Sequence, residues 1–323
     1  MIRYAFYLWT RVWFPDVEAQ DDIERFYTDF VEKLSDVEIR PGRKIHVLNA
    51  EPNDPKRALG KPMIVVVHGS CSRMGHLHNQ IRHFERAGYH VIAFDMFGCG
   101  RSAKPIDGDY GIKSHYDDLL AVISLYTKQY GCKAVVIGHS AGASMCLSLA
   151  TTPIEYNIAG VVALAPIDFI AYRTAQINTR RTFSLPSSLL WLIRPVMTFL
   201  VRHNFFGKNA KTRMMRMEAE GSARNPVHMY KNFWTNFEIS MLPDPIAAPK
   251  AHILIMVGSV DKITPAKGAR RNFQALTEKQ DDLKNEEKKF MLRFQEIPNC
   301  GHCLGPEEPD IVNEAIDKFL ADL

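Results

Sequence analysis

The sequence predicts an α/β protein with a mostly parallel sheet flanked by helices, and three observations lead there. Short apolar runs recur along the chain, segments of helical length lie between several of them, and a serine flanked by glycines follows one run. Continuous apolar runs are typical of strands buried on both faces. Strands that alternate with helices are typical of the α/β class. The 323 residues, 46% apolar and 24% charged, suffice for a large core.

Residues 1–36 are predicted to be an aromatic and basic extension. Six aromatic residues lie among the first fourteen, and Arg3 and Arg11 interrupt the apolar run. The run is far shorter than the roughly 20 residues that a spanning helix needs, and no small-residue cleavage site follows it. At about 100° per residue, four of its apolar residues share one helix face. We therefore expect an amphipathic segment that neither spans a membrane nor is removed.

Regular elements are predicted from residue 37 onward. Residues 37–51 alternate around a Pro-Gly pair, which indicates a hairpin. Buried strands are expected in six apolar runs, at 63–67, 90–94, 134–137, 158–164, 252–257 and 290–297. Residues 111–131 carry apolar side chains at helical spacing, so they are expected to form a helix. The charged run at 278–289 indicates a solvated helix or loop.

The alternation of strand and helix stops between residues 167 and 246. Methionine, aromatic residues and arginine dominate this interval, which predicts a helical lid inserted between core parts at 37–166 and 247–323. From Phe169 to Met217 there are nine Lys or Arg and no Asp or Glu. The whole chain has a net charge of +4, so the residues outside this interval together carry −5. A cationic, apolar lid suits an anionic lipid surface. The alternative is that lid and extension pack on the core or on a protein partner.

Composition also bears on partners and compartment. A net charge of +4 is too small to imply a nucleic-acid partner, and no glycine-and-aromatic RNA-binding signature is present. Six cysteines are scattered through a chain too long to need disulfides, without a secretory leader. We expect free thiols and a cytoplasmic protein that associates peripherally with membranes.

A nucleophile is predicted at Ser140. The motif Gly138-x-Ser140-x-Gly142 lies directly after an expected strand and directly before an expected helix. A serine on such a sharp turn is held out from the sheet, and the glycines are needed because a Cβ atom there would clash with the neighbouring strand and helix. The context distinguishes this motif from a chance match.

A base and an orienting acid are expected at the ends of later strands. A serine is a weak nucleophile at neutral pH and needs both. Asp261 follows the run at 252–257, and His302 follows the run at 290–297. Asp168 competes with Asp261 because it follows the run at 158–164, but Asp261 follows a later strand and is preferred.

Two backbone amides are expected to stabilise an oxyanion. One is the N–H of Ala141, at the start of the helix after the nucleophile. The other is the N–H of Ser70, which follows the strand-ending pair His68-Gly69. His68 is expected to shape this loop, and His139 to fill the variable position of the elbow. Asp95 and Ser102, after the second buried strand, are expected to be structural turn residues.

The stretch "NCGHC" places His302 between Cys300 and Cys303. A zinc site would need further ligands, and no second Cys-x-x-Cys or His-x₃-His pair is placed to supply them. A redox disulfide would make the loop more rigid. We expect two thiols that pack beside the site, and no metal.

The motifs "HGSC", "DMFGCGRS", "GHSAG", "VGSVDKITP" and "NCGHCL" together resemble the α/β-hydrolase superfamily, in particular lid-bearing serine hydrolases of the monoacylglycerol-lipase and carboxylesterase kind. The resemblance implies Ser140 as nucleophile, His302 as base, Asp261 as acid, and Ser70 and Ala141 as oxyanion donors. It implies hydrolysis of a small-molecule or lipid ester without a cofactor. A serine at the elbow argues against haloalkane dehalogenases and epoxide hydrolases, whose nucleophile is aspartate. A binding protein without turnover, or cleavage of thioesters, amides or carbon–carbon bonds, remains an alternative.

Overall fold

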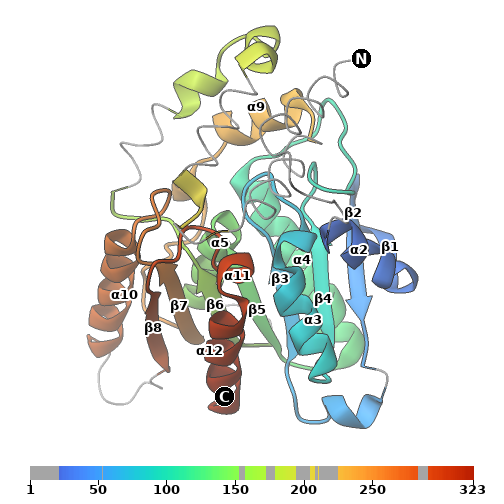
Figure 1. Ribbon diagram of the computed structural model, residues 1–323, viewed down its shortest axis with the longest axis vertical. Coiled ribbons are helices and arrows are strands. Elements are labelled where there is room, and N and C mark those ends of the chain that lie inside the picture. Colours follow the sequence, from blue (N-terminus) through green and yellow to red (C-terminus); the bar gives the residue numbers. More distant parts are fainter. Residues whose placement is uncertain are drawn as a thin grey trace.

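The core is one eight-stranded sheet in the order β1-β2-β4-β3-β5-β6-β7-β8 (Figure 1). The computed structural model describes residues 22–52, 54–152, 157–171, 179–193, 204–207, 210, 225–282 and 290–323. The strands are β1 Leu34–Arg40, β2 Arg43–Ala50, β3 Met63–Val67, β4 Val91–Asp95, β5 Ala134–His139, β6 Ile158–Leu164, β7 His252–Gly258 and β8 Leu292–Ile297. β2 pairs antiparallel with β1 and with β4, whereas neighbours from β4 through β8 are parallel.

Helices cover both faces of the sheet. α4, α5 and α10 pack with one hydrophobic cluster, and α2, α3 and α12 with the other. The helices are α2 Asp22–Asp29, α3 His78–Arg86, α4 Ile112–Tyr130, α5 Ala141–Thr151, α9 Val227–Thr235, α10 Ala266–Asp281, α11 Leu304–Glu307 and α12 Pro309–Ala321. In Figure 1, α3 and α12 lie in front of the sheet. The mostly parallel α/β fold predicted from the sequence is thereby confirmed.

Strand β3 illustrates why the predicted strands are continuously apolar. Ile64 and Val66 belong to one cluster, while Val65 and Val67 belong to the cluster on the other face. All four side chains are fully buried. Successive side chains of a strand point to opposite faces, so a strand that is buried on both faces favours apolar residues at every position.

The predicted elements agree with the structure to within a few residues. β3 coincides with the predicted run, and α4 with the predicted helix less one residue at each end. The hairpin around Gly42 forms, but its first strand begins at Leu34, three residues early. In α4, Leu120 is only partly buried, whereas Asp118 is buried because two arginines of the hairpin pair with it.

The described part of the N-terminal region packs on the core. In α2, Ile23, Phe26 and Tyr27 are buried, and the Tyr27 hydroxyl donates to the Asp95 carboxylate at 3.1 Å. Residues 1–21, which include the predicted amphipathic segment, lie outside the described residues.

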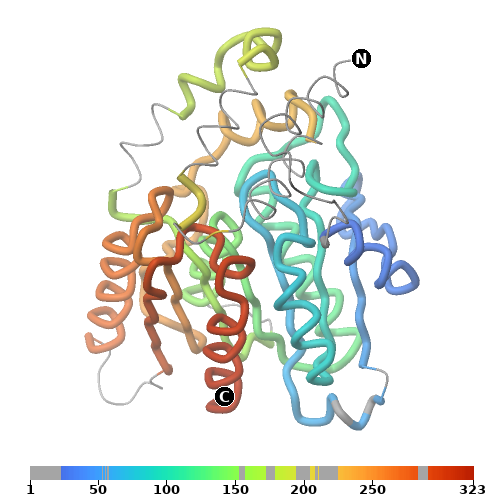
Figure 2. Tube along the Cα trace, viewed as in Figure 1, coloured from blue at the N-terminus to red at the C-terminus, as the bar shows by residue number. Residues whose placement is uncertain are grey.

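Described segments between β6 and β7 lie beyond the carboxyl ends of the parallel strands (Figures 1 and 2). They comprise helical residues 179–183 and 187–193 together with α9, and the described residues there include no strand. The lid boundaries remain a prediction. Of the nine positive residues between Phe169 and Met217, seven lie outside the described parts, leaving Arg180 and Arg181. None of the helices in the described ranges combines the length and the apolar composition of a membrane span.

Candidate active site

Ser140 occupies a strained turn between β5 and α5. Its φ of 54° and ψ of −113° lie in a region that costs a non-glycine residue about 1–3 kcal/mol. A Cβ atom on Gly138 would lie 2.4 Å from the Gly142 oxygen, and one on Gly142 would lie 2.6 Å from the Val67 oxygen. The two glycines therefore allow helix α5 and the end of β3 to approach the turn.

His302 and Asp261 form a buried pair at the same edge of the sheet. His302 Nδ1 lies 2.9 Å from Asp261 Oδ2, and their side chains are 1% and 0% exposed. The other carboxylate oxygen, Oδ1, accepts the N–H groups of Ile263 at 2.7 Å and Thr264 at 2.9 Å. The Thr264 hydroxyl lies 2.7 Å from Oδ2. These contacts hold the carboxylate toward the imidazole.

The second ring nitrogen of His302, Nε2, has a different environment from Nδ1. A proton on Nδ1 faces the Asp261 carboxylate, so Nε2 is the nitrogen with a free lone pair. Among the described residues, Nε2 has no hydrogen-bond partner although it is buried. The ring of His139, next to Ser140 in the chain, lies 4.8 Å from the His302 ring. The buried imidazole of His302 therefore lies close to the turn that carries Ser140.

The loop after β3 lies against the elbow. A Cβ atom on Gly69 would lie 3.1 Å from the Ser140 Cβ, so the loop that continues into Ser70 is close to the hydroxyl-bearing side chain. The Ser72 N–H donates to the Gly69 oxygen at 3.3 Å and closes a turn around Ser70. Ala141 is the first residue of α5, where N–H groups have no partner within the helix.

Neutral histidines support this loop. His68 Nε2 accepts the Met96 N–H at 2.9 Å, so the proton is on Nδ1, which donates to the Gly69 oxygen at 2.7 Å. Burial lowers the pKa of His68 to about 4. Burial also lowers the pKa of His139 well below its ordinary value, with the neighbouring His76 and His302 acting in the same direction. Both rings are therefore fixed in one uncharged form at neutral pH.

The competing carboxylates have other partners. Asp168 pairs with Arg271 of α10, and its Oδ1 accepts the Ile170 N–H at 3.1 Å. Asp95 is fully buried and accepts the Met74 and Arg101 N–H groups, both at 2.7 Å. Neither forms the hydrogen bond to His302 that Asp261 forms.

Ser102 has a structural environment. It accepts the His46 N–H at 2.8 Å and donates to the Asp95 backbone oxygen. These bonds connect strand β2 to the turn after β4.

The cysteines beside His302, Cys300 and Cys303, are buried and form no disulfide bond with each other. Burial raises the pKa of Cys300, and the nearby carboxylates of Glu307, Glu308 and Asp261 act in the same direction. Within the described ranges, no group of three or more His, Cys, Asp or Glu side chains is arranged to hold a metal ion.

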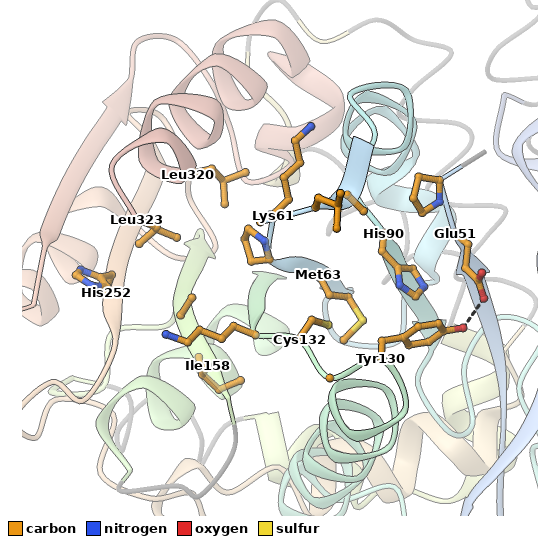
Figure 3. A pocket seen from close by; sticks show the side chains of 18 of the residues that line it. Glu51, Lys61, Met63, His90, Tyr130, Cys132, Ile158, His252, Leu320 and Leu323 are labelled. Carbon is orange, nitrogen blue, oxygen red and sulfur yellow. Dashed lines mark hydrogen bonds between the residues drawn. The ribbon is translucent and has the colours of Figure 1, made fainter. Parts of the chain in front are cut away.

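A separate hollow of about 960 Å³ lies at the opposite edge of the sheet (Figure 3). Met63, Ile158 and His252, which begin β3, β6 and β7, line it together with Leu320 and Leu323. Since Ser140, Asp261 and His302 follow the other ends of their strands, this hollow does not include the candidate site.

Several residues around the site were not anticipated from the sequence. Thr264 bridges Asp261 and the Ala165 oxygen, and Glu307 and Phe205 bind the backbone around His302. Only Thr264 has a local signal, because a threonine three residues after an aspartate is typical of a side-chain-stabilised turn.

Comparison with known proteins identifies the family of the chain. The sequence pattern described as the Alpha/beta hydrolase family matches residues 64–315. The chain belongs to that family, and the resemblance to the α/β-hydrolase superfamily is confirmed.

Among curated proteins the chain is similar to "Protein ABHD8" of Bos taurus, with 24% identity over 298 residues. This match covers 87% of the chain and 61% of the relative, so the chain spans less than two thirds of that protein's length. A shorter match, 31% identical over 125 residues, is to "Epoxide hydrolase B" of Mycobacterium tuberculosis; it covers 38% of this chain and 33% of the relative.

Among solved structures, an esterase from Thermogutta terrifontis is similar with a TM-score of 0.69 and 17% identity, over 90% of this chain and 98% of that chain. At this identity the likeness describes the fold.

Proposed function

We propose that the protein is a serine hydrolase that cleaves a carboxylic ester through an acyl-enzyme intermediate. The observation that carries the proposal is the buried His302–Asp261 pair, with Nε2 unpartnered among described residues, beside the strained Ser140 elbow. The esterase and hydrolase relatives and the family membership support hydrolysis as the reaction class.

In the proposed first half-reaction, the Ser140 hydroxyl attacks the ester carbonyl carbon and its proton passes to His302 Nε2. Asp261 keeps the imidazole in the required tautomer and stabilises its charged form. The N–H groups of Ser70 and Ala141 donate to the developing oxyanion, each contributing roughly 3–4 kcal/mol. The bond to the alkoxy group then breaks, and that group leaves with the proton from Nε2.

In the second half-reaction, water attacks the acyl carbon on Ser140 and gives a proton to His302 Nε2. The bond to Ser140 breaks, its oxygen takes the proton back, and the carboxylic acid leaves. Every proton is exchanged with Nε2, so these two half-reactions need no cofactor.

The identity of the nucleophile favours this function over that of the epoxide hydrolase relative. An aspartate nucleophile would form an ester with an epoxide, whereas position 140 is serine. Thioesters, amides and carbon–carbon bonds would use similar groups, and a binding protein would keep the pocket without turnover. A substrate panel distinguishes these possibilities.

The experiment is hydrolysis of p-nitrophenyl esters of increasing acyl length by the wild type, Ser140→Ala and Ser148→Ala. Ser148 lies two turns further along α5 and is fully buried, which makes it the matched control. We expect turnover by the wild type and the control only. No hydrolysis of any ester by folded wild type, or full activity of Ser140→Ala, would refute the proposal.

We further propose that the substrate is a hydrophobic ester met at an anionic lipid surface. Trp191 and Leu192, on the helical segment 187–193, are 45% and 67% exposed, and Ile170 is 53% exposed. Exposed apolar residues within a strongly cationic stretch fit the interfacial region of anionic bilayers. Packing on another protein is the competing use of this surface.

Sedimentation with phosphatidylserine vesicles tests the lipid proposal. We expect binding at low salt that weakens at high salt, and weaker binding for a variant lacking residues 1–14 and for Trp191→Ser/Leu192→Ser. Phosphatidylcholine vesicles are the control for charge. Absence of binding by protein that hydrolyses soluble esters would refute lipid docking and leave the esterase proposal intact.

A further inference from the structure

The Glu307 side chain, at the end of α11, binds the backbone on both sides of His302. Oε2 accepts the Gly301 N–H at 3.0 Å, and Oε1 accepts the Cys303 N–H at 3.1 Å. One carboxylate thus accepts hydrogen bonds from the two peptide groups that flank His302. Hydrogen bonds to an ionised acceptor are stronger than neutral ones.

The same carboxylate reaches a segment distant in the chain. Oε2 also accepts the Gly207 N–H at 2.8 Å, and the Phe205 oxygen accepts the His302 N–H at 2.6 Å. Residues 204–207 belong to the interval between β6 and β7 and are joined to the base loop through both bonds.

The approach of the two backbones depends on glycine. A Cβ atom on Gly207 would lie 2.3 Å from the Asn299 oxygen, and one on Gly301 would lie 2.3 Å from the Gly207 nitrogen. These are contacts with backbone atoms, so no side chain could rotate away to relieve them. Any larger residue at 207 or 301 would force the two segments apart.

The carboxyl group of Glu307 is half-buried. Burial raises the pKa of its carboxyl group, and the three N–H bonds oppose that shift. A half-buried carboxylate loses part of its hydration, and hydrogen bonds compensate for that loss. A residue that served only to fill space could be apolar, so the three accepted N–H groups indicate a role for the oxygens of Glu307.

We propose that Glu307 is a positioning residue, which holds the backbone on both sides of His302 and connects it to residues 204–207. His302 is then correctly placed for catalysis only while residues 204–207 are packed against its loop. The inference rests on the proposed function of His302. The inference adds that the position of residues 204–207, in the interval after β6, affects the position of His302. Substrates that displace residues 204–207 would thereby act on the base through Glu307.

The test compares Glu307→Ala, Glu307→Gln and Gly207→Ala with Glu308→Ala. Glu308 is the adjacent glutamate, and its side chain accepts no hydrogen bond from any described residue. Each purified full-length variant is assayed for kcat and KM on a short soluble ester. Hydrogen exchange is followed by mass spectrometry in peptides that cover residues 204–207 and 299–304, with thermal unfolding as the check on folding.

We expect kcat of Glu307→Ala to fall about 100-fold, with KM nearly unchanged, because small misplacement of a catalytic group costs about that much. Glu307→Gln keeps one acceptor oxygen and should show a smaller loss. Gly207→Ala should also lower kcat although Glu307 is intact. Exchange should accelerate in both peptides for the Glu307 variants and not for Glu308→Ala.

A kcat of folded Glu307→Ala that equals that of Glu308→Ala would overturn the inference. If Glu307→Ala does not fold, Glu307→Gln and Gly207→Ala decide in the same way. A wild type inactive on every ester would instead refute the proposed function. The exchange rates would then decide whether Glu307 joins the two segments, and unchanged exchange would overturn that too.

Discussion

The buried neutral His68 makes an acid-dependent loss of stability predictable. Its imidazole is fully buried, with Nε2 accepting from Met96 and Nδ1 donating to Gly69. A second proton would remove the acceptor for the Met96 N–H and place a charge in the core. Burial accordingly lowers the pKa of His68 from 6.5 to about 4.

The sign and size of the effect follow from proton linkage. Between about pH 6.5 and pH 4 the folded protein binds fewer protons at this site than the unfolded chain, so the free energy of unfolding falls as the pH falls. The contribution is fully present above pH 6.5. The two pKa values differ by 2.5 units, and each unit corresponds to 1.36 kcal/mol, so the free energy of unfolding is lower by about 3 kcal/mol once the pH is below 4. About 2.5 kcal/mol of this stability is already lost at pH 4.5.

The assay is urea unfolding of the wild type and His68→Gln, followed by tryptophan fluorescence at several pH values between about 7.5 and 4.5. Glutamine can keep an acceptor near the Met96 N–H but does not titrate. The stability advantage of the wild type should therefore shrink by about 2.5 kcal/mol over this range. Other buried histidines titrate equally in both proteins. An advantage that stays constant with pH would refute the reasoning.

Three further results are expected. Asp261→Asn should lower kcat about 10⁴-fold through the wrong imidazole tautomer, whereas Asp168→Asn should keep most activity in the same ester assay; the reverse would move the acid to the end of β6. Gly142→Ala should lower the free energy of unfolding by about 1–3 kcal/mol, measured by urea, because its Cβ atom would lie 2.6 Å from a backbone oxygen; unchanged stability would contradict the close approach. Cys300→Ser/Cys303→Ser, and the wild type after prolonged chelation, should each retain measurable turnover; joint loss of bound zinc and activity would contradict the thiol interpretation.

Much of the fold was predictable because local patterns and global topology agree. The run at 63–67 is buried on both faces, and α4 carries buried apolar side chains at helical spacing. Boundaries were less predictable. The first strand begins at Leu34 because pairing with Leu48 on β2 extends the hairpin beyond its alternating stretch.

The three proposed catalytic residues were accessible to sequence reasoning because each lies just after a strand. The structure brings Asp261 to His302 and gives Asp168 a different partner, Arg271. Glu307 was not accessible in this way, since its contact with Gly207 joins residues 100 positions apart. Such contacts depend on how two loops meet, which no local spacing encodes.

The most direct test of the account is intact-mass and peptide analysis after reaction with a fluorophosphonate. We expect one adduct, on Ser140, that forms in the wild type, forms much more slowly in His302→Ala and is absent from Ser140→Ala. Folded wild-type protein that remains unlabelled, or an adduct on another residue that persists in Ser140→Ala, would contradict a Ser140 nucleophile.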